Sequence, residues 1–148
     1  MLVGDPRRYT RGVSHLSFED ADPSFIPLAG RRALDRAGLR LSLRAWQGLS
    51  LLVRETVARL GEEDEVDGER VRELLEGAAP EPERIEPLAE PPADAVPAVV
   101  SGALGDARPL DARRWRSLSP VARYALFSYA RRDRAEKLAG AYDSLFRS

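Results

Sequence analysis

Cysteine is absent from the 148-residue sequence, and there is one histidine, His15. Without cysteine the chain can form no disulfide, no thiolate metal site and no cysteine nucleophile. A single histidine also excludes a metal site or catalytic centre that needs two imidazoles from one chain. Lysine is almost missing as well, because 22 of the 23 basic residues are Arg and only Lys137 is not.

Long apolar runs and common catalytic motifs are missing too. No stretch of about 18 apolar residues is present, so we expect no transmembrane helix, and the first residues lack the apolar core of a signal peptide. The sequence has no phosphate-binding loop, dinucleotide fingerprint or nucleophile elbow. We therefore predict a cytoplasmic protein with no catalytic residue, no metal, no cofactor and no contact with a membrane.

Charge is abundant and unevenly spread. Residues 1–60 hold ten Arg and six acidic residues, 61–95 hold three Arg and 13 acidic residues, and 96–148 hold ten basic and five acidic residues. The net charge of −1 and the pI of about 5.9 argue against binding to nucleic acid. The doublets Arg31-Arg32 and Arg131-Arg132 also lack the interleaved aromatic residues of a nucleic-acid groove.

Proline concentrates in the acidic region, where six of the 11 prolines lie between residues 77 and 97. Because proline interrupts helices, we predict an extended connector over 77–96. It would join half-units 23–76 and 97–148 of one helical domain, 15–148, after a flexible segment 1–14. Each half has about 60 residues or fewer, which is marginal for independent stability, so we expect one shared core.

The two halves share a sequence pattern at an offset of 69 residues. The only tryptophans, Trp46 and Trp115, coincide at this offset, and each is followed by Leu-Ser three residues later. Arg54 and Arg123 then coincide eight residues after each tryptophan. Coincidence does not readily match all of these residues at once, so the sequence predicts an internal duplication.

The helix signals predict an all-α fold. Ser42 and Asp111 are suited to cap short helices that carry the tryptophans, while Ser50 and Ser119 are suited to cap the longer helices that follow. Gly61 is suited to end the first of these long helices. No convincing strand pattern appears, apart from an extended segment over 12–18. The predicted helices are 27–37, a short one after Ser42, 51–60, 69–76, 97–104, a short one after Asp111, 120–132 and 134–146.

The histidine lies beside carboxylates, in a run that contains His15, Glu19 and Asp20. Such a group can form an acid–base pair, which requires hydrogen-bond contact, or hold one hard cation. The alternative is a solvated loop anchored by Phe18, and the residue pattern favours this alternative.

Tryptophan and arginine supply the other candidate binding residues. Trp46 and Trp115 could stack on a planar ligand, although their spacing from the following Leu is typical of core residues. Arg54 and Arg123 could bind a phosphate or carboxylate, pair with an acid of the other half, or cap a carbonyl. The full set of candidate ligand- or partner-binding residues is His15, Glu19, Asp20, Arg31, Arg32, Trp46, Arg54, Trp115 and Arg123.

Several segments resemble the nitrate reductase-associated proteins, small chains encoded beside assimilatory nitrate reductases. The matching residues are the run Ser-Phe-Ile-Pro-Leu at 24–28, the segment 32–50 with its Gly-x-x-Leu-Ser-Leu-x-x-Trp pattern, and Trp-Arg-Ser-Leu-Ser-Pro-Val-Ala-Arg-Tyr-Ala-Leu at 115–126. The resemblance extends over about residues 15 to 130.

The resemblance implies an accessory role in nitrate assimilation. We expect a non-enzymatic assembly factor that supports a molybdenum-dependent nitrate reductase through protein–protein contact, with the reductase or its cofactor-insertion machinery as partner. The alternative is a small enzyme or ligand-binding protein of a biosynthetic pathway, using His15, Glu19 and Asp20 with an arginine in a cleft. The sequence predicts no particular oligomeric state.

Overall fold

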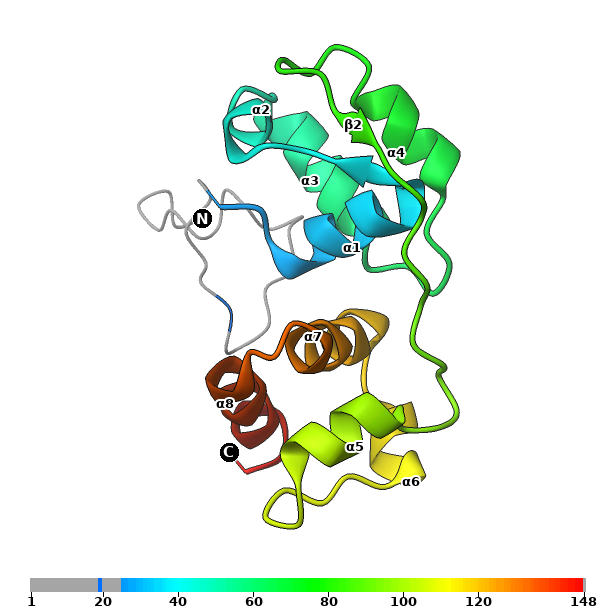
Figure 1. The fold of residues 1–148 in the computed structure, drawn as a ribbon. Helices are drawn as coiled ribbons and strands as arrows, with labels where there is room; N and C mark the ends of the chain where they lie inside the picture. Colours follow the sequence, from blue (N-terminus) through cyan, green and yellow to red (C-terminus); the bar gives the residue numbers. More distant parts are fainter. Residues whose placement is uncertain (1–18, 20–24, 148) are drawn as a thin grey trace, which may run out of the picture. The chain divides into compact units, whose positions relative to one another are not determined.

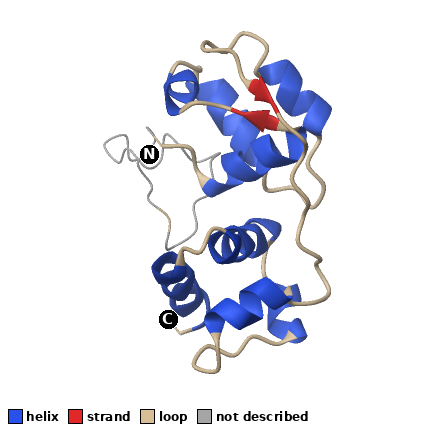
Figure 2. Ribbon diagram, in the orientation of Figure 1, coloured by secondary structure: helices blue, strands red, loops and turns tan. Residues whose placement is uncertain are grey.

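The computed structural model describes Glu19 and residues 25–147, and most of this backbone is helical (Figure 1, Figure 2). The described residues separate into two compact units. Unit 1 contains Glu19 and residues 25–89, and unit 2 contains residues 90–147. The predicted flexible segment 1–14 and the extended segment 12–18 lie outside the described residues.

Unit 1 is built on three helices that pack against one another, α1, α3 and α4. A short helix, α2, lies between the first two along the chain and carries Trp46 (Figure 1). Buried apolar side chains from all four helices form its hydrophobic cluster. The helices are α1 (Leu28–Ala37), α2 (Leu43–Gln47), α3 (Leu51–Leu60) and α4 (Gly68–Leu74).

In unit 2, helices α5, α7 and α8 likewise pack against one another. The short helix α6 carries Trp115 and precedes α7 along the chain. Unit 2 has a hydrophobic cluster of its own, whereas the sequence predicts one shared core. The helices are α5 (Ala98–Leu104), α6 (Ala112–Ser117), α7 (Pro120–Arg131) and α8 (Ala135–Phe146).

The four predicted caps form as expected. The side chains of Ser42 and Asp111 accept the backbone N–H three residues later, and Ser50 and Ser119 do the same. Each cap satisfies one of the backbone donors that a helix start leaves unpaired. The predicted helices are thereby confirmed, with bounds that differ by no more than two residues.

Two short strands correct the prediction of a strand-free chain. Strand β1 (Leu39–Arg40) pairs antiparallel with β2 (Glu83–Arg84), so that Leu39 faces Arg84. The pairing continues as Ile85 N donates to Gly38 O at 2.9 Å and Leu88 N donates to Asp35 O at 3.0 Å. Residues 83–88 of the proline-rich segment are thus hydrogen-bonded to the end of α1 within unit 1.

Gly61, at the end of α3, lies tightly against the backbone of α1. A Cβ atom at this position would lie 1.7 Å from the carbonyl oxygen of Ala29, on α1. The φ angle of Gly61 is −70°, so its backbone is open to any residue. Gly61 ends α3 as the sequence predicts, but its φ is not left-handed, so glycine is required here by packing: only a residue without Cβ fits against α1. Gly38, with φ of 73°, is the left-handed cap that ends α1.

Candidate functional site

Arg32 is a buried cation of unit 1, with 2% of its surface exposed. Its guanidinium donates to the carbonyl oxygens of Gly61 at 2.7 Å and Asp64 at 2.9 Å, and also to that of Glu63. These carbonyls follow the C-terminus of α3, where backbone acceptors lack helical partners and a positive charge is favourable. Arg32 thus stabilises the loop between α3 and α4 through these hydrogen bonds.

Residues at the start of α1 also form internal contacts. Pro27, which precedes the helix, offers no side-chain cap, and the carboxylate of Glu19 instead accepts a hydrogen bond from Leu28 N. Arg31 is exposed and its Nε donates to Ile26 O at 3.3 Å. The other two members of the predicted histidine–carboxylate group, His15 and Asp20, lie outside the described residues.

The two tryptophans are both buried core side chains, with exposed fractions of 1% for Trp46 and 0% for Trp115. Their indole N–H groups differ. Trp115 Nε1 donates to the carbonyl oxygen of Pro92 at 2.6 Å, while Trp46 Nε1 is buried without a hydrogen-bond partner. Trp46 also packs closely against α1, since a Cβ on Gly30 would lie 3.3 Å from its ring.

Arg54 and Arg123 occupy the same place in the first turns of α3 and α7, and both are partly buried. Arg123 donates from Nη1 to the carbonyl oxygen of Leu118 at 2.5 Å, just before the start of its own helix. This contact agrees with one of the three roles predicted for Arg123, the capping of a backbone carbonyl.

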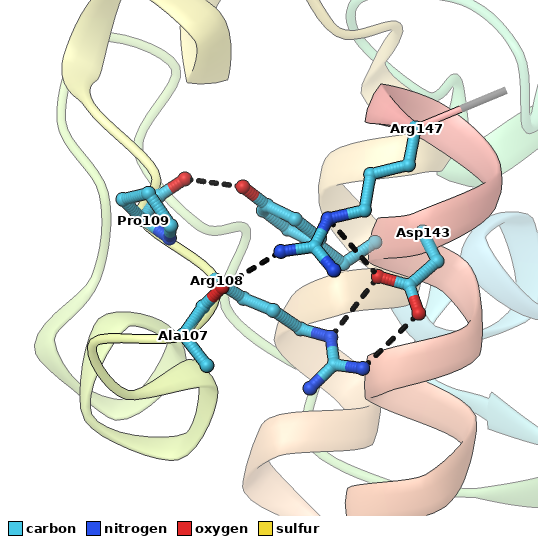
Figure 3. Close-up of polar contacts among 6 residues, drawn as sticks. Ala107, Arg108, Pro109, Asp143 and Arg147 are labelled. Carbon is cyan, nitrogen blue, oxygen red and sulfur yellow. Dashed lines mark hydrogen bonds and ion pairs between the residues drawn. The ribbon is translucent and has the colours of Figure 1, made fainter.

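A cluster of polar contacts in unit 2 joins the loop between α5 and α6 to helix α8 (Figure 3). Arg108 binds Asp143 through two hydrogen bonds of 3.1 Å, one to each carboxylate oxygen. Arg147 lies 3.7 Å from the same carboxylate and donates to Ala107 O at 2.7 Å. Tyr142 donates its hydroxyl to Pro109 O at 2.5 Å. These contacts, which attach residues 107–109 to the last turns of α8, were missed in the sequence because the partners are 33 to 40 residues apart.

Asp143 and Arg108 stabilise each other's charged forms. The hydrogen bonds from Arg108 lower the pKa of Asp143 from its ordinary value, partly opposed by desolvation, and the charges of Arg108 and Arg147 lower it further. The hydrogen bonds to Asp143 raise the pKa of Arg108. This pair stays charged at neutral pH and holds the loop to α8.

An open hollow of about 430 Å³ lies beside this cluster within unit 2. Cβ atoms placed on two of its glycines, Gly102 and Gly105, would meet no atom within 4 Å. These two glycines therefore face open space, and Arg108 on the wall of the hollow is already paired with Asp143. Its lining residues are Ser101, Gly102, Gly105, Asp106, Arg108, Pro109 and Leu110.

The two units present different exposed side chains from equivalent helices. Unit 1 exposes leucines at the starts of α2 and α3, with exposed fractions of 39% for Leu43, 41% for Leu51 and 70% for Leu52. Unit 2 buries Val121 at the position equivalent to Leu52. The short helix of unit 2, α6, exposes three arginines. None of these surface residues was among the candidates predicted from the sequence.

The predicted site residues are divided between the units. Glu19, Arg31, Arg32, Trp46 and Arg54 belong to unit 1, and Trp115 and Arg123 belong to unit 2. Within the described part of the chain, no group of three or more His, Cys, Asp or Glu is arranged to hold a metal ion. The same part contains no helix that is long and apolar enough to cross a membrane.

Residues 18–139 match the model of a family described as conserved nitrate reductase-associated protein. The match takes in both tryptophans, all four predicted caps and the helices from α1 to the first residues of α8. No curated protein and no solved structure gives a significant match.

Proposed function

Because this chain belongs to the family of conserved nitrate reductase-associated proteins, we propose that it is a non-enzymatic accessory factor for nitrate reductase. It would support the maturation or activity of the molybdenum-dependent enzyme through protein–protein contact, in the cytoplasm. The observation that carries this proposal is the family match, which spans parts of both units.

The use of the polar side chains supports a binding role over a catalytic one. Arg32 and Arg123 donate to backbone carbonyls, and Glu19 accepts from the start of α1. These are contacts that hold helices and loops in place. The exposed side chains of α2, α3 and α6 are available for contact with a partner.

An internal duplication is part of the same proposal. Helices α1 to α4 and α5 to α8 follow in the same order at an offset of about 69 residues, and each set has a Trp-bearing short helix before a Ser-capped long one. In both sets the first, third and fourth helices pack against one another. The two units then provide two related surfaces that have diverged in their exposed residues.

Deletion of the gene in the source organism tests the accessory role. We expect the deleted strain to lose growth on nitrate as sole nitrogen source while it still grows on ammonium, and purified nitrate reductase from it to contain less molybdenum. Restoring the full chain should restore both properties. Unchanged nitrate reductase activity and molybdenum content in the deleted strain would overturn the proposal.

His15→Ala separates the accessory role from catalysis. A catalyst that uses this imidazole as an acid or base would lose about 10²- to 10⁴-fold in rate, and the strain would behave like the deletion. An accessory protein should tolerate the substitution, and the variant should restore growth on nitrate as well as the wild type does.

A further inference from the structure

Helix α6 carries three arginines on one side. In an α-helix, residues 113, 114 and 116 fall within an arc of about 160°, while Trp115 lies on the opposite side and is completely buried. All three arginines are exposed. Arg113, Arg114 and Arg116 together form what we term the arginine face.

The arginine face has no carboxylate partner within the described chain. In the described part of unit 2, Asp143 forms ion pairs with Arg108 at 3.1 Å and with Arg147 at 3.7 Å, and with none of the arginines of α6. Asp111 accepts the backbone N–H of Arg114 as the helix cap. The guanidinium of Arg114 lies 5.7 Å from the ring centre of Phe146, which restrains its position without neutralising it.

Unpaired guanidinium groups on one short helix are suited to bind carboxylates. Residues three positions apart on a helix are neighbours, and like charges there repel. A bound anion would remove this repulsion. Arginine binds a carboxylate through two parallel hydrogen bonds, and Arg108 with Asp143 shows that geometry in the same unit.

Helix α2 of unit 1, which coincides with α6 at the offset of 69 residues, has no cluster of three arginines. At the offset of 69 residues, Arg113 coincides with Arg44, but Arg114 coincides with the buried Ala45 and Arg116 with Gln47. A cluster of three cations is thus particular to α6 and does not follow from the shared helix arrangement.

We propose that the arginine face is the docking surface for an acidic segment of the partner protein, which rests on the proposed accessory function. Three cations within about one helical turn match a few carboxylates of a folded or extended segment. A nucleic acid would need a longer positive surface, and the net charge of this chain is −1. The partner therefore presents clustered Asp and Glu side chains to α6.

Binding of a defined acidic probe tests the surface in vitro. The probe is a fluorescein-labelled peptide of about ten glutamates, titrated with the full chain by fluorescence anisotropy at about 0.15 M salt. The triple variant R113Q/R114Q/R116Q keeps helix-forming residues and removes three exposed charge contacts, so we expect about 10-fold weaker binding. Circular dichroism and the tryptophan emission, compared with those of the wild type, check that the variant is folded.

The matched control is R131Q/R132Q/R134Q, which removes the same charge from exposed positions elsewhere on unit 2. This control should bind the peptide within about 2-fold of the wild type. An equal loss in both triple variants would mean a diffuse charge effect and would overturn the proposal. Tighter binding of a single-stranded oligonucleotide than of the peptide, or oligomers of the wild type that dissociate in the α6 variant, would overturn it in favour of a nucleic acid or a second copy.

The same variants in the deleted strain separate this inference from the proposed function. If the wild-type chain restores growth on nitrate and R113Q/R114Q/R116Q does not, while the control variant does, the docking surface is supported. If the wild type and both variants restore growth equally, the docking surface is wrong and the accessory function stands. If deletion itself has no effect on nitrate reductase, the accessory function fails, and the peptide titration still decides whether α6 binds acidic segments.

Discussion

Units 1 and 2 use the same order of helices but hold their long helices in different ways. In unit 1 the end of α3 touches the backbone of α1 at Gly61, and the buried guanidinium of Arg32 binds the carbonyls that follow. In unit 2 the equivalent positions are Ala130, inside the apolar cluster, and the exposed Ser101. Unit 2 instead attaches the loop before α6 to α8 through Arg108 and Asp143. A common helix arrangement is therefore compatible with a buried polar support in one unit and a surface ion pair in the other.

Among the variants that test this difference between the units, Gly61→Ala should destabilise the protein most. The new methyl group would lie 1.7 Å from the carbonyl oxygen of Ala29, so the backbone of α1 or α3 must move. Such overpacking should cost about 3 kcal/mol or more of folding free energy. Hydrogen exchange should show faster opening of α1 and α3 than in the wild type, with α7 and α8 unchanged.

The matched control at the equivalent position is Ala130→Gly in unit 2. It removes a methyl group and adds backbone freedom near the end of α7, which should cost about 1 kcal/mol. A Gly61→Ala variant as stable as the wild type would show that α1 and α3 do not pack as closely as described.

Removal of the buried guanidinium should have the next largest effect. Arg32→Met leaves the carbonyl oxygens of Gly61, Glu63 and Asp64 without this donor, at a cost of about 2–3 kcal/mol. The midpoint of urea unfolding measures the loss. Arg31→Met is the matched control one residue away, and because Arg31 is exposed it should change stability by less than about 0.5 kcal/mol. Equal losses for the two variants would refute a supporting role specific to Arg32.

Replacing each tryptophan should give a smaller difference in stability between the two units. Trp115→Phe removes a hydrogen bond to Pro92, whereas Trp46→Phe removes an indole N–H that has no partner. Both variants lose similar aromatic volume, so Trp115→Phe should be more destabilising by about 1–2 kcal/mol. Thermal unfolding of the two single-tryptophan proteins, followed by fluorescence, measures the difference. The reverse order would contradict the described indole contacts.

The smallest expected effect is the pH dependence of unit 2. The pKa of Asp143 is lowered in the folded chain, so its contribution to stability is present above the unfolded pKa of about 3.9 and is lost as the pH falls through the folded pKa. Carboxyl carbon shifts from NMR should show Asp143 titrating below that value. Asp143→Asn should remove this part of the acid sensitivity, and an unchanged acid profile in the variant would contradict the assigned pair.

Local signals account for the parts of the fold that the sequence predicted. The caps at Ser42, Ser50, Asp111 and Ser119 depend on residues three positions apart, and so the helix starts could be located from the sequence. Strands β1 and β2 could not, since each has two residues and the paired residues lie 43 and 45 positions apart. Likewise, the sequence marked Gly61 as the end of a helix but could not show the contact with Ala29 that requires glycine.

The candidate residues were recognised less well than the fold, for a related reason. Side-chain type identified Arg32 and Arg123 as notable, yet their acceptors are carbonyl oxygens, which every residue possesses and no sequence pattern distinguishes. The Arg108–Asp143 pair spans 35 positions and was not visible before the helices were placed. The arginine face was overlooked because its meaning depends on which side of α6 is covered by the core.

The hydrogen bonds of the proline-rich segment leave a very short stretch of chain between the units. Leu88 is tied to α1 by its backbone N–H, and Pro92 receives the indole N–H of Trp115. Leu88 is thus held to unit 1, and Pro92, four positions further along the chain, is held to unit 2. A chain divided between these two residues would break none of the hydrogen bonds described above, so this point is a suitable boundary for expressing the two units as separate polypeptides.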